Sequence, residues 1–107
     1  MLRKQERIPF LTEVTLEFAA GRREARISDL GEGGCYVECI ATVRPGEVLH
    51  FEIPLPNGTV ARASGEVKYV FSGMGFGMRF LDVPDDLRSM IDTAIYSAPP
   101  ADGLVET

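Results

Sequence analysis

Two short segments of this chain bring charged side chains together with glycine or with a second charge. The first, Arg3-Lys4-Gln5-Glu6-Arg7, spaces two guanidinium groups four residues apart, ahead of the first predicted strand. The second, Ser28-Asp29-Leu30-Gly31-Glu32-Gly33-Gly34, sets a carboxylate beside three glycines between two predicted strands. A guanidinium fork binds phosphate or carboxylate, and a carboxylate accepts hydrogen bonds from N–H donors. Each segment taken alone also fits a solvated charge cluster, or a tight loop with positive φ angles.

The other reactive side chains do not form a catalytic or metal site. His50 is the one histidine, and strand alternation puts it opposite the apolar positions, which favours a solvent-facing side chain over a catalytic base. Cys35 and Cys39 are about 13 Å apart along a strand that rises ~3.3 Å per residue, which is too far for a disulfide or a shared metal. Asp85 and Asp86 suit the first turn of a helix better than an acid–base pair. We therefore predict that the protein is not an enzyme and has no catalytic residue, metal or cofactor.

The length and composition predict a single domain. The chain has 107 residues, of which 45% are hydrophobic, and this allows one modest core and not two. No apolar run approaches the ~18 residues of a membrane span, and the first residues lead into no secretory signal. Two cysteines do not make a disulfide scaffold. A reducing cytoplasm is therefore the expected compartment, without membrane insertion.

Charge is distributed unevenly along the chain. The net charge is −5, yet residues 1–26 carry six Arg or Lys against four Asp or Glu, and residues 27–107 carry five against twelve. Because domains that bind DNA or RNA present basic surfaces, the acidic body argues against either as a partner. The basic N-terminal end remains compatible with a small anion.

The pattern between these segments predicts a mostly β domain. Turn signals recur about every eight to twelve residues between alternating runs, as in a small antiparallel barrel or sandwich. Pro56-Asn57-Gly58 is the strongest turn signal, since Asn-Gly tolerates positive φ. The predicted inward positions before this turn are Val14, Leu16, Phe18, Ala25, Ile27, Cys35, Val37, Cys39, Leu49, Phe51 and Ile53. The strand from Val60 to Phe71 presents Ala61, Ala63, Gly65, Val67, Tyr69 and Phe71 in one register.

After residue 83 the period changes to that of a helix. Pro84, Asp85 and Asp86 suit a first helical turn. An apolar stripe at three- and four-residue spacing follows, which would cover an open barrel end; its members are Leu87, Met90, Ile91, Ala94 and Ile95. We expect residues 1–11 to form an arm, residues 12–96 the barrel with its helix, and residues 97–107 a disordered tail.

Together, the two segments resemble the signature of the PilZ domain family, which is R-x-x-x-R, a strand pair, and then D/N-x-S-x-x-G. Arg3 and Arg7 match the first motif, and Asp29 and Gly34 match the ends of the second. Gly31 stands where the family has serine, so this position departs from the pattern.

The resemblance extends over most of the chain. Gly77-Met78-Arg79-Phe80-Leu81 is similar to the family's last strand, and a helix follows it as expected. The match runs from Arg3 to about Tyr96. It implies a six-stranded antiparallel β-barrel with a C-terminal α-helix capping one end.

The resemblance also implies a ligand, the bacterial second messenger cyclic di-GMP. Arginine can engage the O6 and N7 edge of guanine or the phosphates, a carboxylate can accept from the opposite edge, and glycine N–H groups can form an anion-binding nest. The residues implied to bind the ligand are Arg3, Arg7, Asp29, Gly31, Gly33 and Gly34. The expected function is a receptor that passes ligand occupancy to an unidentified downstream protein, through ordering of its N-terminal arm.

Gly31 supports an alternative, a degenerate adaptor of the same fold that no longer binds nucleotide. Loss of the serine hydroxyl removes one hydrogen bond, worth about 1 kcal/mol, which weakens binding about fivefold. Because two arginines and the aspartate are retained, we favour the receptor over the adaptor.

Overall fold

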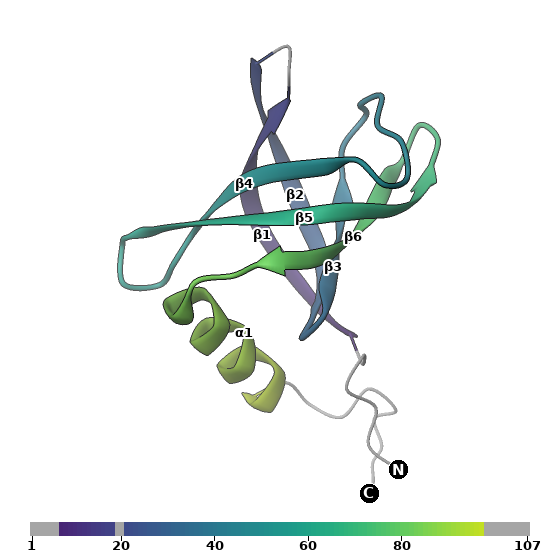
Figure 1. The fold of residues 1–107 in the computed structure, drawn as a ribbon. Helices are drawn as coiled ribbons and strands as arrows, with labels where there is room; N and C mark the ends of the chain where they lie inside the picture. The colour runs from purple at the N-terminus through teal and green to yellow at the C-terminus, as the bar shows by residue number, and fades with distance from the viewer. Residues whose placement is uncertain (1–6, 19–20, 98–107) are drawn as a thin grey trace, which may run out of the picture.

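The computed structural model describes residues 7–18 and 21–97, and the side chains of residues 7–10 and 97 lie outside this description. Six strands and one helix follow one another along these residues. They are β1 (Arg7–Phe18), β2 (Gly21–Gly31), β3 (Gly34–Glu38), β4 (Val48–Pro54), β5 (Val60–Phe71), β6 (Gly75–Asp82) and α1 (Asp85–Ser97). Figure 1 shows the strands wrapped into a barrel with α1 across one end. The predicted six-stranded antiparallel barrel with a C-terminal helix is confirmed.

The strands close into a barrel in the order β1-β2-β3-β6-β5-β4, with every neighbouring pair antiparallel. Closure depends on the shortest ladder, in which residues 15–17 of β1 pair with residues 50–52 of β4. Such closure leaves no continuous unpaired strand edge around the barrel wall that the structure describes.

The core fills the barrel with the side chains that alternate inward along each strand. The largest fully buried ones include Phe51 and Phe76, and Leu16, Ile27 and Ile53 are also buried. The inward positions predicted before residue 54 are all buried or packed against this core. Gly58 has φ of 91°, as the predicted Asn-Gly turn requires.

Helix α1 closes the barrel end through its apolar stripe. Leu87 and Ile91 are almost completely buried, and Met90, Ala94 and Ile95 pack against the core. The Pro84 carbonyl accepts the first helical hydrogen bond from the Arg88 N–H at 2.9 Å, and the first turn is acidic, which complements the helix dipole. No helix in the described part of the chain is long and apolar enough to cross a membrane.

The first strand is longer than the sequence analysis predicted, since it begins at Arg7 and not at Thr12. The register with β2 shifts between Pro9 and Thr12, and this irregularity interrupts the alternation that marks a strand. Residues 1–6 of the expected arm and residues 98–107 of the expected tail lie outside the described residues.

The single register predicted for Val60 to Phe71 is wrong in its last part. The pairing of β5 with β6 shifts between Val67 and Tyr69, so that Lys68 is an extra residue in the ladder. An extra residue reverses the alternation of side chains that follow it. Tyr69 and Phe71 therefore lie on the outer wall, with exposed fractions of 39% and 54%, and Val70 turns toward the core.

Candidate functional site

Two bulges turn the candidate site residues out of the barrel. In β2, Ile27 pairs with Val37 and Asp29 with Tyr36, so that Ser28 is an extra residue. Since Ile27 is buried, regular alternation would have pointed the Asp29 carboxylate into the core. Bulges commonly re-aim side chains next to functional sites. Here the bulge in β2 turns the half-buried Asp29 side chain toward the outer wall, and the one in β5 exposes the ring of Tyr69.

These side chains share one row across the outer wall. Asp29 of β2 pairs with Tyr36 of β3, Tyr36 pairs with Gly77 of β6, and Gly77 pairs with Tyr69 of β5. Three strand spacings of ~4.8 Å separate the ends of the row, or about 14 Å. The row therefore presents a carboxylate at one end and an aromatic ring at the other.

Glycine at position 77 makes room for the rings in this row. A Cβ at Gly77 would clash with the ring of Tyr69, which lies over the strand at that point. The rings of Tyr36 and Tyr69 stack with their centroids 6.3 Å apart, and Phe71 meets Tyr69 edge-on at 5.5 Å. The outer wall thus carries a small aromatic cluster, comprising Tyr36, Tyr69 and Phe71.

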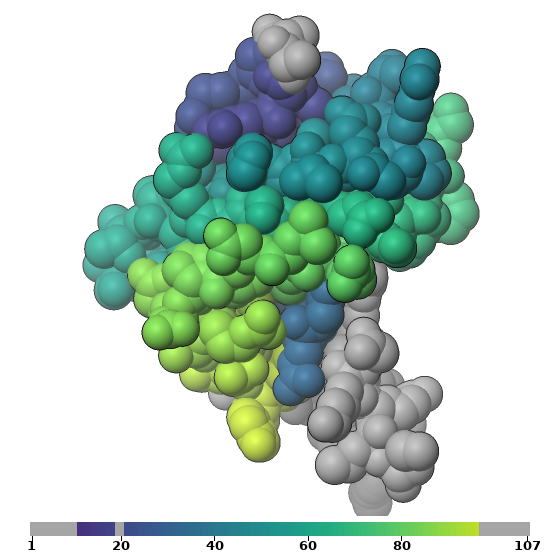
Figure 2. Space-filling model, in the orientation of Figure 1, coloured from purple at the N-terminus to yellow at the C-terminus, as the bar shows by residue number. Residues whose placement is uncertain are grey.

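The connection between β2 and β3, residues 31–34, is held at its two middle carbonyl groups. The Gly33 carbonyl accepts from the Phe80 N–H of β6 at 2.8 Å, and the Glu32 carbonyl accepts from the Arg88 guanidinium of α1 at 3.0 Å. Figure 2 shows the blue surface of this connection lying against the yellow-green surface of α1. The connection, which we call the glycine loop, is therefore fixed by both a strand and the helix.

Gly34 is required for close packing and not for a positive φ. A Cβ at this position would clash with the backbone carbonyl of Met78 in β6, and its φ lies outside the left-handed region. The sequence analysis gave a tight loop with positive φ angles as one explanation of this segment, and for Gly34 this is wrong.

A pocket of about 210 Å³ opens beside the glycine loop. One side is formed by Gly31, Gly33 and Gly34, and the other by four residues of β5 and β6, which are Lys68, Tyr69, Met78 and Arg79. Three of the predicted site residues therefore share a concave surface with two cations and an aromatic ring.

The cations of this pocket share one acidic neighbour. Glu66 lies 3.2 Å from the Arg79 guanidinium and 3.8 Å from the Lys68 ammonium group. Two cations against one carboxylate leave an excess of positive charge on a chain that is acidic overall. This local excess favours an anionic ligand.

The two arginines of the first motif are only partly described. Arg7 opens β1 and its Cα partner is Gly31, while Pro9 is the partner of Asp29. The backbone at the end of the first motif is thus adjacent in the sheet to the second motif. The side chain of Arg7, and Arg3 as a whole, lie outside the described residues.

Tyr36 lies at the middle of the wall row, and its hydroxyl oxygen is buried without a hydrogen-bond partner in the described structure. Burial raises the pKa of Tyr36 above its ordinary value of 10.0, and the negative charges of Tyr69, Glu38 and Asp29 raise it further. The influence of the Asp29 charge is consistent with a carboxylate on the same outer face.

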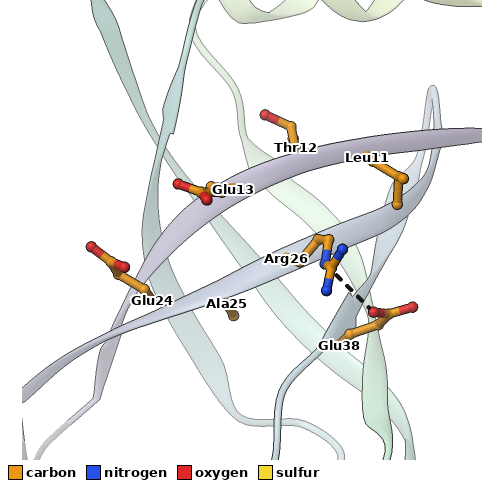
Figure 3. A pocket seen from close by; sticks show the side chains of 7 residues that line it. All are labelled: Leu11, Thr12, Glu13, Glu24, Ala25, Arg26 and Glu38. Carbon is orange, nitrogen blue, oxygen red and sulfur yellow. Dashed lines mark ion pairs between the residues drawn. The ribbon is translucent and has the colours of Figure 1, made fainter.

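A larger pocket of about 520 Å³ lies elsewhere on the wall, over β1, β2 and β3 (Figure 3). Three carboxylates line it, from Glu13, Glu24 and Glu38, and the one guanidinium, that of Arg26, is 3.8 Å from Glu38. Because the carboxylates outnumber the guanidinium, this surface disfavours a dinucleotide with two phosphates. The smaller pocket, with its excess of positive charge, is therefore the better candidate for an anionic ligand.

The residues that the sequence analysis set aside are not gathered into a site. His50 is exposed on the outer face of β4, while Cys35 is buried and Cys39 is half-buried, and neither cysteine belongs to a disulfide within the described residues. Burial raises the pKa of the Cys39 thiol, against a smaller opposing influence of Arg23. Within residues 7–18 and 21–97, no three His, Cys, Asp or Glu side chains come together to hold a metal ion.

Sequence reasoning missed the half of the pocket contributed by β5 and β6. Tyr69 was assigned to a regular strand register, and the bulge at Lys68 reverses it. Arg79 belongs to Gly77–Leu81, the segment that resembles the family's last strand, and no binding role was predicted for it. One signal in the sequence could have indicated the bulge. Glu66 and Lys68 occupy alternate positions around Val67, and the aromatic Tyr69 follows at a position where regular alternation would point its ring inward.

Several solved structures share this fold. The Bacillus subtilis inhibitor of motility (MotI/DgrA) superposes with a TM-score of 0.76 at 15% identity, over 90% of this chain and 51% of that one. Escherichia coli YcgR in complex with c-di-GMP gives 0.71 at 19% identity, over 89% and 45%. The chain thus spans about half the length of these two proteins.

A further structure covers the same extent as this chain. The PilZ domain of Escherichia coli YcgR with c-di-GMP gives a TM-score of 0.65 at 18% identity, over 91% of both chains. No curated protein matches the sequence. Residues 1–97 match the PilZ domain family, and this range includes every described residue as well as the N-terminal motif. The fold, the two motifs in their order and this match agree, and the chain belongs to the PilZ domain family.

Proposed function

We propose that this chain is a receptor for cyclic di-GMP that binds it on the outer barrel wall, at the glycine loop and the facing residues of β5 and β6. The observation that carries the proposal is the pocket in which Gly31, Gly33 and Gly34 face Lys68, Tyr69 and Arg79. Family membership and the two YcgR structures solved with c-di-GMP support it.

The wall row supplies the groups that a guanine requires. The N1–H and N2 amino donors of guanine suit the Asp29 carboxylate, and a purine face suits the exposed ring of Tyr69, about three strands away. A ligand with two purines joined by two phosphates presents both features at once. The wall is thus suited to a cyclic purine dinucleotide better than to a mononucleotide.

The phosphates would be met by positive charge from two directions. In this proposal Arg3 and Arg7 approach from the N-terminal segment, and the excess positive charge of Lys68 and Arg79 over Glu66 lies on the opposite side. Charge-assisted hydrogen bonds of this kind are shorter and stronger than neutral ones. Glycine N–H groups of the loop add donors at close range.

Occupancy would be passed on through the N-terminal segment. A segment that carries two ligand-binding arginines changes its exposed surface when they engage the ligand, and a downstream protein can recognise that change. Under this proposal the protein is not an enzyme, binds no metal or cofactor, and acts in the cytoplasm.

Calorimetric titration with cyclic di-GMP tests the receptor directly. We expect saturable binding by the full chain, at least tenfold weaker binding by Arg7→Ala and by Asp29→Ala, and near wild-type binding by the control Arg44→Ala. Arg44 is exposed in the connection between β3 and β4 and does not line the pocket. GTP serves as the matched ligand control. Absence of binding at ligand concentrations far above micromolar would falsify the proposal.

The adaptor remains the second candidate, and the observation that favours it is Gly31 in place of the motif serine. This alternative predicts a protein partner that binds equally well with and without the dinucleotide. The receptor predicts that adding cyclic di-GMP changes the affinity for that partner.

A further inference from the structure

Arg88 joins helix α1 to the glycine loop across 56 residues of sequence. Its guanidinium donates a hydrogen bond to the backbone carbonyl of Glu32 at 3.0 Å, and Glu32 stands between two glycines that line the pocket. Arg88 itself is half-buried and does not line the pocket. Its bond therefore acts on the loop from the side away from the proposed ligand.

The geometry of the peptide group gives this bond a consequence for the pocket. The Glu32 carbonyl and the Gly33 N–H belong to one peptide unit, and no peptide bond among the described residues is cis. In a planar trans peptide the carbonyl and the N–H point in opposite directions. Holding the Glu32 carbonyl toward α1 therefore turns the Gly33 N–H away from the helix, and Gly33 lines the pocket.

The sheet and the helix hold neighbouring peptide units of the loop. The next carbonyl, that of Gly33, is held by the Phe80 N–H of β6 at 2.8 Å, so the loop is fixed on its β3 side by the sheet. Glycine at position 33 permits many backbone conformations, and the Arg88 bond selects one of them. Arg88 is in turn held by α1, because Leu87 is almost completely buried and the Arg88 N–H bonds to the Pro84 carbonyl.

We infer that Arg88 is a positioning residue for the ligand site: by anchoring the Glu32 carbonyl to α1, it sets the orientation of the Gly33 N–H. The inference rests on the proposed function, since the oriented donor is one for a ligand phosphate. By reciprocity, a ligand that needs this loop conformation also strengthens the attachment of α1 to the loop.

The test compares the affinity for cyclic di-GMP of the full chain and three variants. Arg88→Met keeps most of the apolar stem and removes the donor, and we expect about tenfold weaker binding. Arg88→Lys supplies a donor again, and we expect it to recover most of the loss. Ser89→Ala, at the exposed neighbouring position of α1, is the matched control and should bind as the wild type does.

A second measurement on the wild-type chain does not depend on how the variants fold. In an NMR titration with cyclic di-GMP, the Gly33 amide and the Arg88 guanidinium N–H signals should shift together and exchange more slowly with solvent. A merely structural arginine would leave the Arg88 guanidinium signal unchanged while the Gly33 amide shifts with the ligand.

The outcomes separate the two proposals. If the wild type binds and Arg88→Met binds equally well, with a lowered melting temperature alone, the inference is overturned and the receptor stands. If the wild type does not bind, the proposed function fails and the inference fails with it. If Arg88→Met does not fold, wild-type guanidinium signals that ignore the ligand overturn the inference.

Discussion

Arg22 and Glu52 are thirty residues apart in sequence, and their side chains form an ion pair at 2.6 Å on the outer wall of the barrel. The pair reaches over β1, which lies between β2 and β4. Glu17 of β1 and Arg62 of β5 complete a ring in which each arginine contacts both glutamates, at 2.6 to 3.2 Å. The ring thus lies beside the shortest ladder of the barrel, that between β1 and β4.

The first prediction concerns this ring. Glu52→Gln removes one charge that faces two arginines, and we expect the free energy of unfolding to fall by about 0.5–1 kcal/mol at low salt, because the arginines are more than half exposed and screened by water. The loss should shrink at high salt. Urea unfolding at both salt concentrations checks this, with Glu47→Gln in the loop before β4 as control. A salt-independent loss would contradict an electrostatic origin.

The second prediction concerns the ring of Tyr69. If a purine stacks on it, Tyr69→Ala should weaken cyclic di-GMP binding about tenfold, since stacking of a base on an aromatic ring is worth about 1–3 kcal/mol. Tyr69→Phe keeps the ring and should bind within about twofold of the wild type. Calorimetric titration of both variants measures the difference. Equal loss in both would point to the hydroxyl group, and no loss in either would remove Tyr69 from the site.

The third prediction concerns the departure from the family motif. Gly31→Ser restores the motif hydroxyl, and we expect about fivefold tighter binding from one added hydrogen bond. Gly31 is buried and pairs with Arg7, so the melting temperature must be measured alongside the affinity. A variant that keeps its stability and binds no better would show that this chain does not use a hydroxyl at position 31.

The fourth prediction follows from the buried hydroxyl of Tyr36. Tyr36→Phe removes an unpaired polar atom, and we expect the free energy of unfolding to rise by about 1 kcal/mol at neutral pH. Because folding raises the pKa of this phenol, its ionisation leaves the free energy of unfolding of the wild type unchanged below pH 10 and lowers it as the pH rises from 10 through the raised value in the folded chain.

Unfolding measured from neutral to alkaline pH checks both statements. Tyr36→Phe should lose less stability above pH 10 than the wild type, whereas the control Tyr96→Phe, at a position 90% exposed, should follow the wild type. A destabilised Tyr36→Phe would indicate that the hydroxyl has a partner after all.

The architecture could be predicted from sequence because the inward alternation is regular over most of each strand. Leu49, Phe51 and Ile53 keep one face throughout β4, and the Asn-Gly turn after them is unambiguous. The helix was equally clear, since its apolar stripe has its own period. These patterns depend on local spacing, which a single sequence displays fully.

The site could be predicted only in part, since its geometry depends on two bulges. Ser28 and Lys68 are the extra residues in their ladders, and neither is marked by a glycine or a proline of its own. The motif spacing therefore predicted Asp29 and the glycine loop. The positions of Tyr69 and Arg79 on the other side of the pocket depend on strand register, which only the structure shows. The bond from Arg88 to Glu32 joins distant segments, and no local pattern reports it.

The two bulges also set which parts of the chain tolerate changes in length. Deleting Lys68 would restore regular alternation, swing the Tyr69 ring into a filled interior and remove it from the surface in a single step. The tip of the following hairpin, residues 72–74, is exposed and would accept an added residue at little cost. We therefore expect insertions and deletions among functional relatives to collect at that tip and to spare the middle of β5.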